Sequence, residues 1–258
     1  MKKILVIVPI PMGEDGLALR RGQSHVAKVK DDTELVYRAV AVGPRSFQGA
    51  QDMTIVDFAV LQAGSTAEKE GFDAVCVDTM SDSGVAALRS VLKIPVVGAG
   101  RTAFMTALML GSKFSIIVMY KPWIPMQQKT LKEYGLMDRL ASIRSIDHPP
   151  TPYSKNGGVA MGDEEDDVLP KLEKVARLAI EEDGAEVILM GSTTMYRGAA
   201  YVAERVSAPV IAAGPLTYRY AEMFLDLGLT QFNDGNTISP MPLQGMLARM
   251  VGAAGEHD

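Results

Sequence analysis

Apolar runs of strand length alternate along this chain with longer segments in which apolar residues recur at helical spacing. The predicted strands are residues 4–9, 35–42, 74–78, 94–98, 114–119, 187–191 and 209–212. These runs lack a polar face, which is typical of parallel strands covered on both sides. The predicted helices are residues 53–69, 84–92, 102–110, 126–134, 168–182, 196–206, 218–227 and 242–250. This alternation predicts an α/β fold built from right-handed βαβ units.

Two polar segments interrupt the pattern, at residues 13–32 and 148–167. Long stretches without structure of their own are often lids or disordered loops, and the second segment is a candidate lid. Its acidic end, GDEEDD, would also place favourable charge at the start of the helix that follows.

Residues 71–100 and 184–214 read as two copies of one strand, loop, helix and strand unit. In register, Asp73 pairs with Glu186, Thr79 with Ser192, and Gly100 with Gly214 after a one-residue insertion. The repeat predicts two pseudo-symmetric lobes, each a mainly parallel sheet flanked by helices, with the active site in the cleft between them. We expect the first lobe to span residues 1–100 and 215–258, and the second residues 101–214.

The chemistry is expected at Thr79 and Ser192, because open α/β sheets bind ligands beyond the carboxyl ends of their strands. The loops DTMSDSG and GSTTMYRG each follow a buried strand and lead into a helix, where unpaired backbone N–H groups attract anions. Two such loops would form a two-sided cradle for a carboxylate or oxyanion. The alternative is that Thr79, Ser81, Ser192, Thr193 and Thr194 only cap helices, a common role of Ser and Thr.

The composition of the chain argues against some classes of binding partner. The net charge is −5 and the 26 Lys and Arg residues are scattered, which gives no footprint for nucleic acid or an anionic membrane. No apolar run approaches the roughly 20 residues that span a bilayer. The single cysteine, Cys76, rules out a disulfide within the chain. We therefore expect a cytoplasmic protein that acts on a small molecule.

Neither a metal nor a nucleotide cofactor is indicated. The three histidines lack metal-ligand spacing. Gly98 and Gly100 lack the third glycine and the later acidic residue of a dinucleotide fingerprint, and no P-loop is present. We expect no metal site and no cofactor.

The opening ILVIVPIP, the two strand-end loops and the Pro-Val strand after each resemble the aspartate/glutamate/hydantoin racemase superfamily over essentially the whole chain. The resemblance implies cofactor-independent chemistry at an enolisable carbon and a homo-oligomer. Members carry a cysteine at each of two strand ends, where this chain has Thr79 and Ser192. Its only cysteine, Cys76, lies three residues earlier, inside a strand. An aliphatic hydroxyl is a far weaker acid than a thiol, so two-thiol racemisation is excluded.

A second resemblance is to the arylmalonate decarboxylase branch of the superfamily, which also includes maleate isomerase-like members. The stretch GSTTMYRGAA is similar to the hydroxyl-rich loop that holds a carboxylate and its developing enediolate there. Tyr120 matches a tyrosine of that oxyanion pocket, and Pro9 and Pro11 match an early VPP turn. In that branch, however, the hydroxyl loop lies in the first lobe, whereas here it lies in the second.

Asp78 is the predicted proton carrier. A carboxylate at the end of a buried strand is partly desolvated, which raises its pKa and suits it to general acid or base chemistry. The alternative is that Asp78 or Asp82 caps the following helix. Lys121 and Arg197 could pair with a substrate carboxylate or remain solvated.

Other predicted binding residues lie at the strand ends. Met12 and Met80 either fill the core or contact an apolar part of the substrate. The full predicted binding set is Pro9, Pro11, Met12, Met80, Ser81, Lys121, Gly191, Thr193, Thr194 and Arg197.

Three functions stay open. The first is an isomerase or decarboxylase that acts on a small anionic carboxylate or a cyclic amide through an oxyanion, with Asp78, Thr79, Ser192 and Tyr120 as catalytic residues. The second is a hydrolase or lyase that opens a lactone, lactam or imide ring, using Ser192 or a water activated by Asp78 or His148. The third is a catalytically silent binding protein for small anions.

Overall fold

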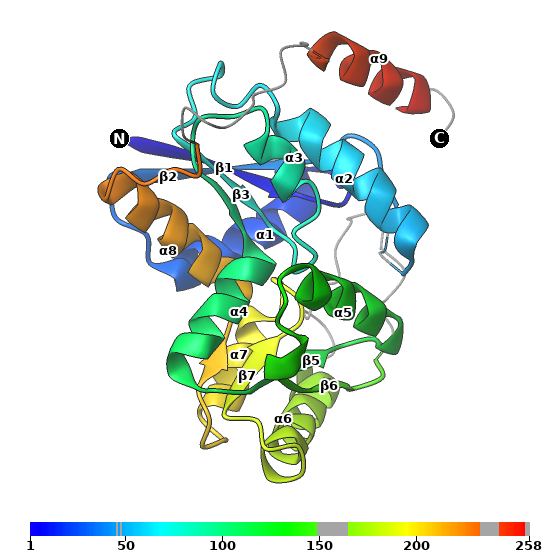
Figure 1. Cartoon of the computed structure of the whole chain (residues 1–258), viewed down its shortest axis with the longest axis vertical. Coiled ribbons are helices and arrows are strands. Elements are labelled where there is room, and N and C mark those ends of the chain that lie inside the picture. The colour runs from blue at the N-terminus through cyan, green and yellow to red at the C-terminus, as the bar shows by residue number, and fades with distance from the viewer. Residues whose placement is uncertain (45, 47, 149–164, 233–242, 256–258) are drawn as a thin grey trace.

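The chain folds into two lobes, each built around a four-stranded parallel sheet (Figure 1). The computed structural model describes residues 1–44, 46, 48–148, 165–232 and 243–255. The first sheet has the order β2-β1-β3-β4, formed by β1 (Lys2–Val8), β2 (Thr33–Ala39), β3 (Ala74–Val77) and β4 (Val96–Gly98). The second has the equivalent order β6-β5-β7-β8, formed by β5 (Phe114–Val118), β6 (Leu140–Ser145), β7 (Val187–Met190) and β8 (Val210–Ile211). The predicted two-lobed α/β class is confirmed.

Helices cover both faces of each sheet. They are α1 (Glu14–Ala27), α2 (Ala50–Gly64), α3 (Val85–Arg89), α4 (Ala99–Leu110), α5 (Ile124–Glu133), α6 (Glu165–Glu181), α7 (Tyr196–Ala203), α8 (Ala213–Asp226) and α9 (Gln244–Gly255). Two 3₁₀ helices, η1 (Lys121–Trp123) and η2 (Met137–Arg139), flank α5.

Alternate residues of each central strand enter different cores. In β1, Leu5 and Ile7 pack beneath α2 and α3, while Ile4 and Val6 pack against α1 and α8. In the second lobe, α4 and α5 cover one face of the sheet and α6 and α7 the other. Burial on both faces explains why the strand sequences are apolar without alternation.

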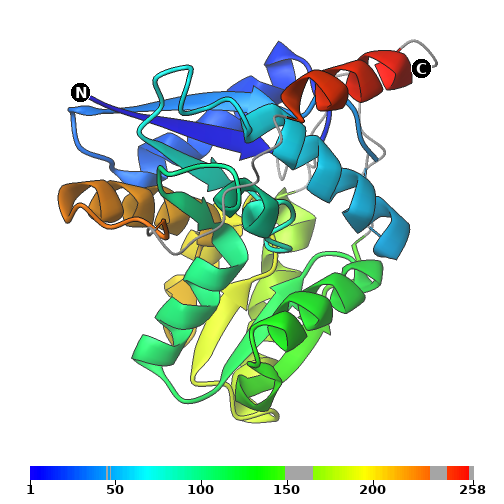
Figure 2. The same ribbon diagram turned by 45° about the horizontal axis from the view of Figure 1, so that its top comes forward.

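Two helices cross between the lobes (Figures 1 and 2). Helix α4 follows β4 of the first sheet but packs on β7 of the second, and α8 follows β8 of the second sheet but packs on β1, β3 and β4 of the first. The exchange interlocks the lobes and fixes the carboxyl ends of their central strands relative to each other. The lobe boundaries at residues 100 and 214 remain a prediction, with which this packing is consistent.

The second residue of each crossing helix is a glycine that lies against a site loop. A Cβ on Gly100 would lie 2.3 Å from the main-chain oxygen of Met80. A Cβ on Gly214, its partner in the repeat, would lie 2.9 Å from the main-chain oxygen of Thr193 and 2.0 Å from Gln23 Oε1. Only glycine permits this close approach of helix and loop.

The structure corrects the sequence reading of residues 13–32, which contain helix α1 and not a continuous loop. Its buried face consists of Gly16, Arg20, Gln23 and Ala27, so half of that face is polar and no apolar period is visible. The strand β6 was also missed. All six of its residues are partly exposed, as befits the edge of a sheet.

The candidate lid at residues 148–167 falls mostly outside the described residues, which resume at Glu165. Among the helices that are described, none is both long and apolar enough to cross a membrane.

Candidate active site

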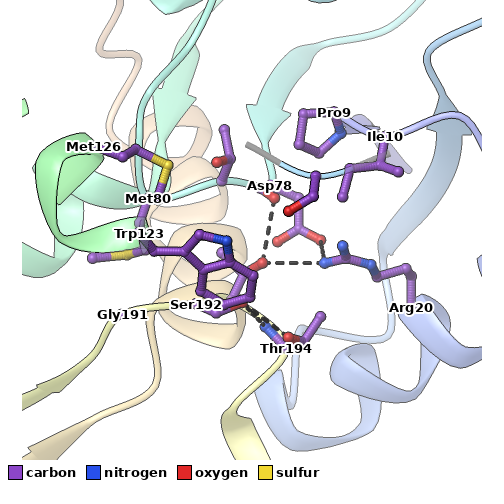
Figure 3. Close-up of a pocket in the computed structure, with 13 residues that line it drawn as sticks. Pro9, Ile10, Arg20, Asp78, Met80, Trp123, Met126, Gly191, Ser192 and Thr194 are labelled. Atoms are coloured by element: carbon purple, nitrogen blue, oxygen red, sulfur yellow. Dashed lines mark hydrogen bonds and ion pairs between the residues drawn. The ribbon is translucent and has the colours of Figure 1, made fainter. Parts of the chain in front are cut away.

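The carboxyl ends of β1, β3, β5 and β7 meet at a pocket (Figure 3). Thr79 reaches it from the first lobe and Ser192 from the second, so the two repeat-related hydroxyls share one cavity. The predicted residues that line it are Pro9, Asp78, Thr79, Met80, Gly191, Ser192, Thr193 and Thr194. Five further lining residues were not predicted from the sequence: Ile10, Arg20, Ser46, Trp123 and Met126.

Asp78 is the buried carboxylate of this pocket. It directly follows β3, and its side chain is fully buried. Its Oδ2 atom accepts hydrogen bonds from Arg20 Nη1 at 3.2 Å and from Gln23 Nε2 at 3.3 Å, whereas Oδ1 has no partner among the described residues. Burial raises the pKa of Asp78, and the positive charge of Arg20 opposes the rise. The result is an oriented carboxylate with one free oxygen, more basic than an ordinary aspartate.

Arg20 also connects the lobes. Its Nη1 donates to Thr193 Oγ1 at 3.2 Å as well as to Asp78, and Thr193 Oγ1 in turn donates to the main-chain oxygen of Asp78 at 3.3 Å. Its side chain is only 10% exposed, so the pair with Asp78 is shielded from water. This three-residue link holds the loop after β7 against the loop after β3.

Each loop carries its own hydroxyl network. Thr79 Oγ1 lies 3.0 Å from Ser81 Oγ, which donates to Ser83 Oγ at 3.0 Å. In the second loop, Ser192 Oγ lies 2.9 Å from Thr194 Oγ1. These chains fix the hydroxyl positions in advance of any ligand.

The capping alternative does not describe these loops. Helix α3 begins after Gly84 and α7 after Met195, and neither helix has a side-chain cap. Within the described chain, the backbone N–H groups of Met80 and Thr193 find no acceptor. These two residues occupy equivalent repeat positions, and their N–H groups could donate to an anion in the pocket.

Asp82 caps a helix, but not the one that follows it. Its carboxylate accepts the backbone N–H groups of Gly100 and Arg101 at 2.8 and 2.7 Å, at the start of α4, and the Tyr134 hydroxyl at 2.6 Å. Burial raises its pKa as well, and the hydrogen bond from Tyr134 opposes the shift. Asp82 therefore positions α4 against the first site loop and does not line the pocket.

Several predicted residues lie outside the pocket lining. Ser81 is buried behind Thr79, and Tyr120 stacks edge-on against Trp123 with ring centroids 6.5 Å apart. Lys121 and Arg197 are exposed on the surface. The complete set outside the lining is Pro11, Met12, Ser81, Tyr120, Lys121 and Arg197.

Cys76 is buried inside β3 with no solvent exposure, and its Sγ lies 3.8 Å from the main-chain oxygen of Thr217. Burial raises the pKa of its thiol. A thiolate is therefore disfavoured at the one position where the chain has sulfur to offer as a base. Among the described residues, no three His, Cys, Asp or Glu side chains are grouped so as to hold a metal.

A model of the Asp/Glu/Hydantoin racemase family matches residues 21–221, and the chain belongs to this family. It is similar to the hydantoin racemase of Pseudomonas sp. (strain NS671), with 29% identity over 230 residues that cover 88% of this chain and 87% of the relative. It is also similar to the hydantoin racemase of Paenarthrobacter aurescens, with 27% identity over 229 residues, 88% of this chain and 92% of the relative.

Solved structures support the same fold. The allantoin racemase from Klebsiella pneumoniae superposes with a TM-score of 0.83 at 23% identity, covering 95% of this chain and 99% of that one. A liganded mutant of arylmalonate decarboxylase superposes with a TM-score of 0.62 at 16% identity, covering 89% and 94%. At these identities the likeness establishes the two-lobed architecture alone.

Proposed function

We propose that this protein is a cofactor-independent enzyme that moves a proton at a carbon next to a carbonyl group, with Asp78 as the base. The substrate class is a small cyclic amide or carboxylate. The observation that carries the proposal is the buried Asp78 carboxylate, whose Oδ1 atom is free while Oδ2 is held by Arg20 and Gln23.

The geometry suits this reaction. Oδ1 would take the proton from the carbon acid, and Arg20 would keep the carboxylate oriented and ionised before the transfer. The electron pair left behind moves onto the carbonyl oxygen and forms an enolate. Ser192, Thr194 and the backbone N–H groups of Met80 and Thr193 are donors that could stabilise that negative charge.

The relatives named above are hydantoin and allantoin racemases, and hydantoin and allantoin are cyclic amides with an acidic ring C–H. The pocket lining combines apolar side chains with a few polar groups, as small-molecule sites usually do. Isomerisation and decarboxylation remain alternative outcomes, because loss of CO₂ from a carboxylated carbon gives the same kind of enolate. With one cysteine in the chain, the reaction cannot use a pair of thiols from one subunit.

A single base makes a stereochemical prediction. Asp78 reaches the substrate carbon from one face, so a proton that it removes and exchanges with solvent returns mostly to that face. Exchange should therefore run faster than racemisation. The test is incubation of one enantiomer of 5-benzylhydantoin in deuterium oxide, with NMR for loss of the C5 proton and chiral chromatography for the enantiomer ratio.

The matched variants are Asp78→Asn and Asp226→Asn. Asp78→Asn keeps the shape of the side chain but is a poor base, and the exchange rate should fall at least about 100-fold, the usual contribution of a positioned general base. Asp226 forms ion pairs with Lys2 and Lys30 and does not line the pocket, so Asp226→Asn should exchange at the wild-type rate. Wild-type exchange in Asp78→Asn would contradict the proposal.

The hydrolase alternative requires a base next to Ser192, whose Oγ is bonded to the Thr194 hydroxyl. A water activated by Asp78 or His148 is the other route to hydrolysis, and opening of the probe's ring in the same incubation would favour it. A silent binding protein would be stabilised by 5-benzylhydantoin without exchange or ring opening. The homo-oligomer and the cytoplasmic location stay predictions from the sequence.

A further inference from the structure

Three buried side-chain polar atoms that line the pocket have no hydrogen-bond partner among the described residues. They are Asp78 Oδ1, Ser46 Oγ and Trp123 Nε1. Buried polar atoms are nearly always paired, because an unpaired one loses its hydration without compensation. Three unpaired atoms from three chain segments around one cavity indicate that a bound ligand completes their hydrogen bonds.

Trp123 is the most informative of the three. The indole Nε1 can only donate a hydrogen bond, so it specifies an acceptor on the ligand. In the view of Figure 3, the indole ring lies between the methionine side of the pocket and the Arg20–Asp78 pair, with its nitrogen turned towards Asp78. The donor from the second lobe therefore faces the base from the first.

The indole ring is firmly held. Trp123 ends η1, which is separated from β5 by Met119 and Tyr120, and its backbone N–H donates to the main-chain oxygen of Tyr120 at 3.0 Å. The ring packs against the cores of both lobes and edge-on against the Tyr120 ring. A donor fixed in this way needs little reorganisation when a ligand arrives.

The neighbouring lining is apolar. Pro9, Ile10, Met80 and Met126 are apolar residues of the pocket lining; in Figure 3 the two methionines lie beside the indole ring, and Pro9 and Ile10 lie on the other side of Asp78. A planar ring with an apolar substituent and a carbonyl oxygen at its edge would fit this pocket. The ring and substituent would contact the apolar residues, and the carbonyl oxygen would accept a hydrogen bond from a polar group.

We propose that Trp123 is a substrate-binding residue whose indole N–H donates a hydrogen bond to a carbonyl oxygen of a planar ligand, across the pocket from Asp78. The inference rests on the proposed function for the identity of the carbon acid, but the hydrogen bond itself can be tested by binding alone. A donor on that oxygen would strengthen as negative charge develops there during proton removal.

The first measurement uses the fluorescence of Trp123, the only tryptophan of the chain. Titration of the wild-type protein with 5-benzylhydantoin should change its emission in a saturable way, because the ligand contacts the indole directly. Binding without any change in emission would place the ligand away from Trp123 and overturn the inference. Absence of binding by this probe would overturn the proposed ligand class.

The second measurement separates the hydrogen bond from the ring contact. By calorimetry, Trp123→Phe should bind 5-benzylhydantoin about fivefold to tenfold more weakly than wild type, since it keeps an aromatic ring but loses the donor. The 4-thioxo analogue of the probe presents a weaker acceptor, so its affinity should differ less between the two proteins. Equal losses for both probes would assign the effect to packing and refute the hydrogen bond.

Met126→Leu is the matched control, because it changes the same wall without removing a donor. It should affect both probes equally. If Trp123→Phe does not fold, the wild-type protein still tests the inference, since it should prefer the oxo probe to the thioxo probe, and equal affinity would contradict the donor role. Binding that depends on Trp123 without isotope exchange would refute the proposed function while supporting this inference.

Discussion

Replacement of Gly100 by alanine should disturb the active site from outside the pocket. Gly100 is the second residue of α4 and faces the loop that carries Thr79. An alanine Cβ would lie 2.3 Å from the main-chain oxygen of Met80, whereas ordinary van der Waals contact begins at 3.4 Å. The two backbones must separate by about 1 Å, because no change of side-chain rotamer can move a carbonyl oxygen.

The expected cost follows from this overlap. Forced overpacking of a well-packed contact typically costs about 1–3 kcal/mol of folding free energy. For a chain of this size, a loss of about 2 kcal/mol lowers the midpoint of thermal unfolding by roughly 4–8 °C. The loop that moves contains Thr79 and follows Asp78. A misplacement of about 1 Å in reacting groups can reduce the rate about 100-fold.

The assay compares thermal unfolding and the rate of C5–H exchange for Gly100→Ala, wild type and Gly252→Ala. Gly252 lies within α9, and nothing is within 4 Å of its added Cβ. Because alanine favours helix more than glycine does, Gly252→Ala should be up to about 1 kcal/mol more stable than wild type and fully active. If Gly100→Ala melts and exchanges like wild type, the loop is not held by this contact and the reasoning is wrong.

Four further predictions concern charge and sulfur. Asp78 must be ionised to act as a base, and burial raises its pKa above the ordinary aspartate value of 3.8. The exchange rate should therefore decline as pH falls through a value above 3.8. A rate that stays constant down to pH 3.8 would contradict this. Because its pKa is raised on folding, Asp78 contributes fully to stability below its unfolded pKa of about 3.9, and this contribution is lost as pH rises through the folded pKa. Denaturant titration should therefore show a smaller loss of unfolding free energy with rising pH in Asp78→Asn than in wild type. Arg20→Met removes the positive charge that opposes the rise in the pKa of Asp78, so the acid limb of the pH–rate profile should move to higher pH. Where Asp78 is ionised, the variant should also lose about 3–5 kcal/mol of unfolding free energy. An unmoved acid limb would exclude this role for Arg20. Cys76→Ala should keep the wild-type exchange rate and lose about 1 kcal/mol of stability, and loss of exchange in a folded variant would restore the thiol as a candidate.

The sequence predicted the parts of the molecule that repeat. The two copies placed Thr79 and Ser192 at equivalent strand ends, and the structure brings both to one pocket. The apolar strands were predictable because burial on both faces leaves no polar alternation to obscure them. The edge strand β6 was not, because its residues are all partly exposed.

The residues that the sequence did not reveal are those whose neighbours are distant in the chain. Arg20 lies 58 positions from Asp78 and 173 from Thr193, and the polar inner face of α1 hid that helix. Trp123 lies four residues after the predicted strand 114–119 and is the only tryptophan of the chain, which was a usable signal. The sequence analysis instead predicted Tyr120 and Lys121 as the site residues of this turn. Backbone geometry decides which residue of a tight turn faces the pocket, and composition does not encode that geometry.

The two lobes repeat one fold, but the site between them is asymmetric. In register with the pairing of Thr79 and Ser192, the second repeat has Gly191 where the first has Asp78. A Cβ on Gly191 would lie 2.6 Å from Val118 Cγ1 and 3.0 Å from the main-chain oxygen of Ile117, so this position has no room for a carboxylate. The second lobe can therefore offer hydroxyl and N–H donors but no equivalent base. In the function that we propose, the base therefore comes from the first lobe alone, and the second lobe supplies donors that stabilise negative charge.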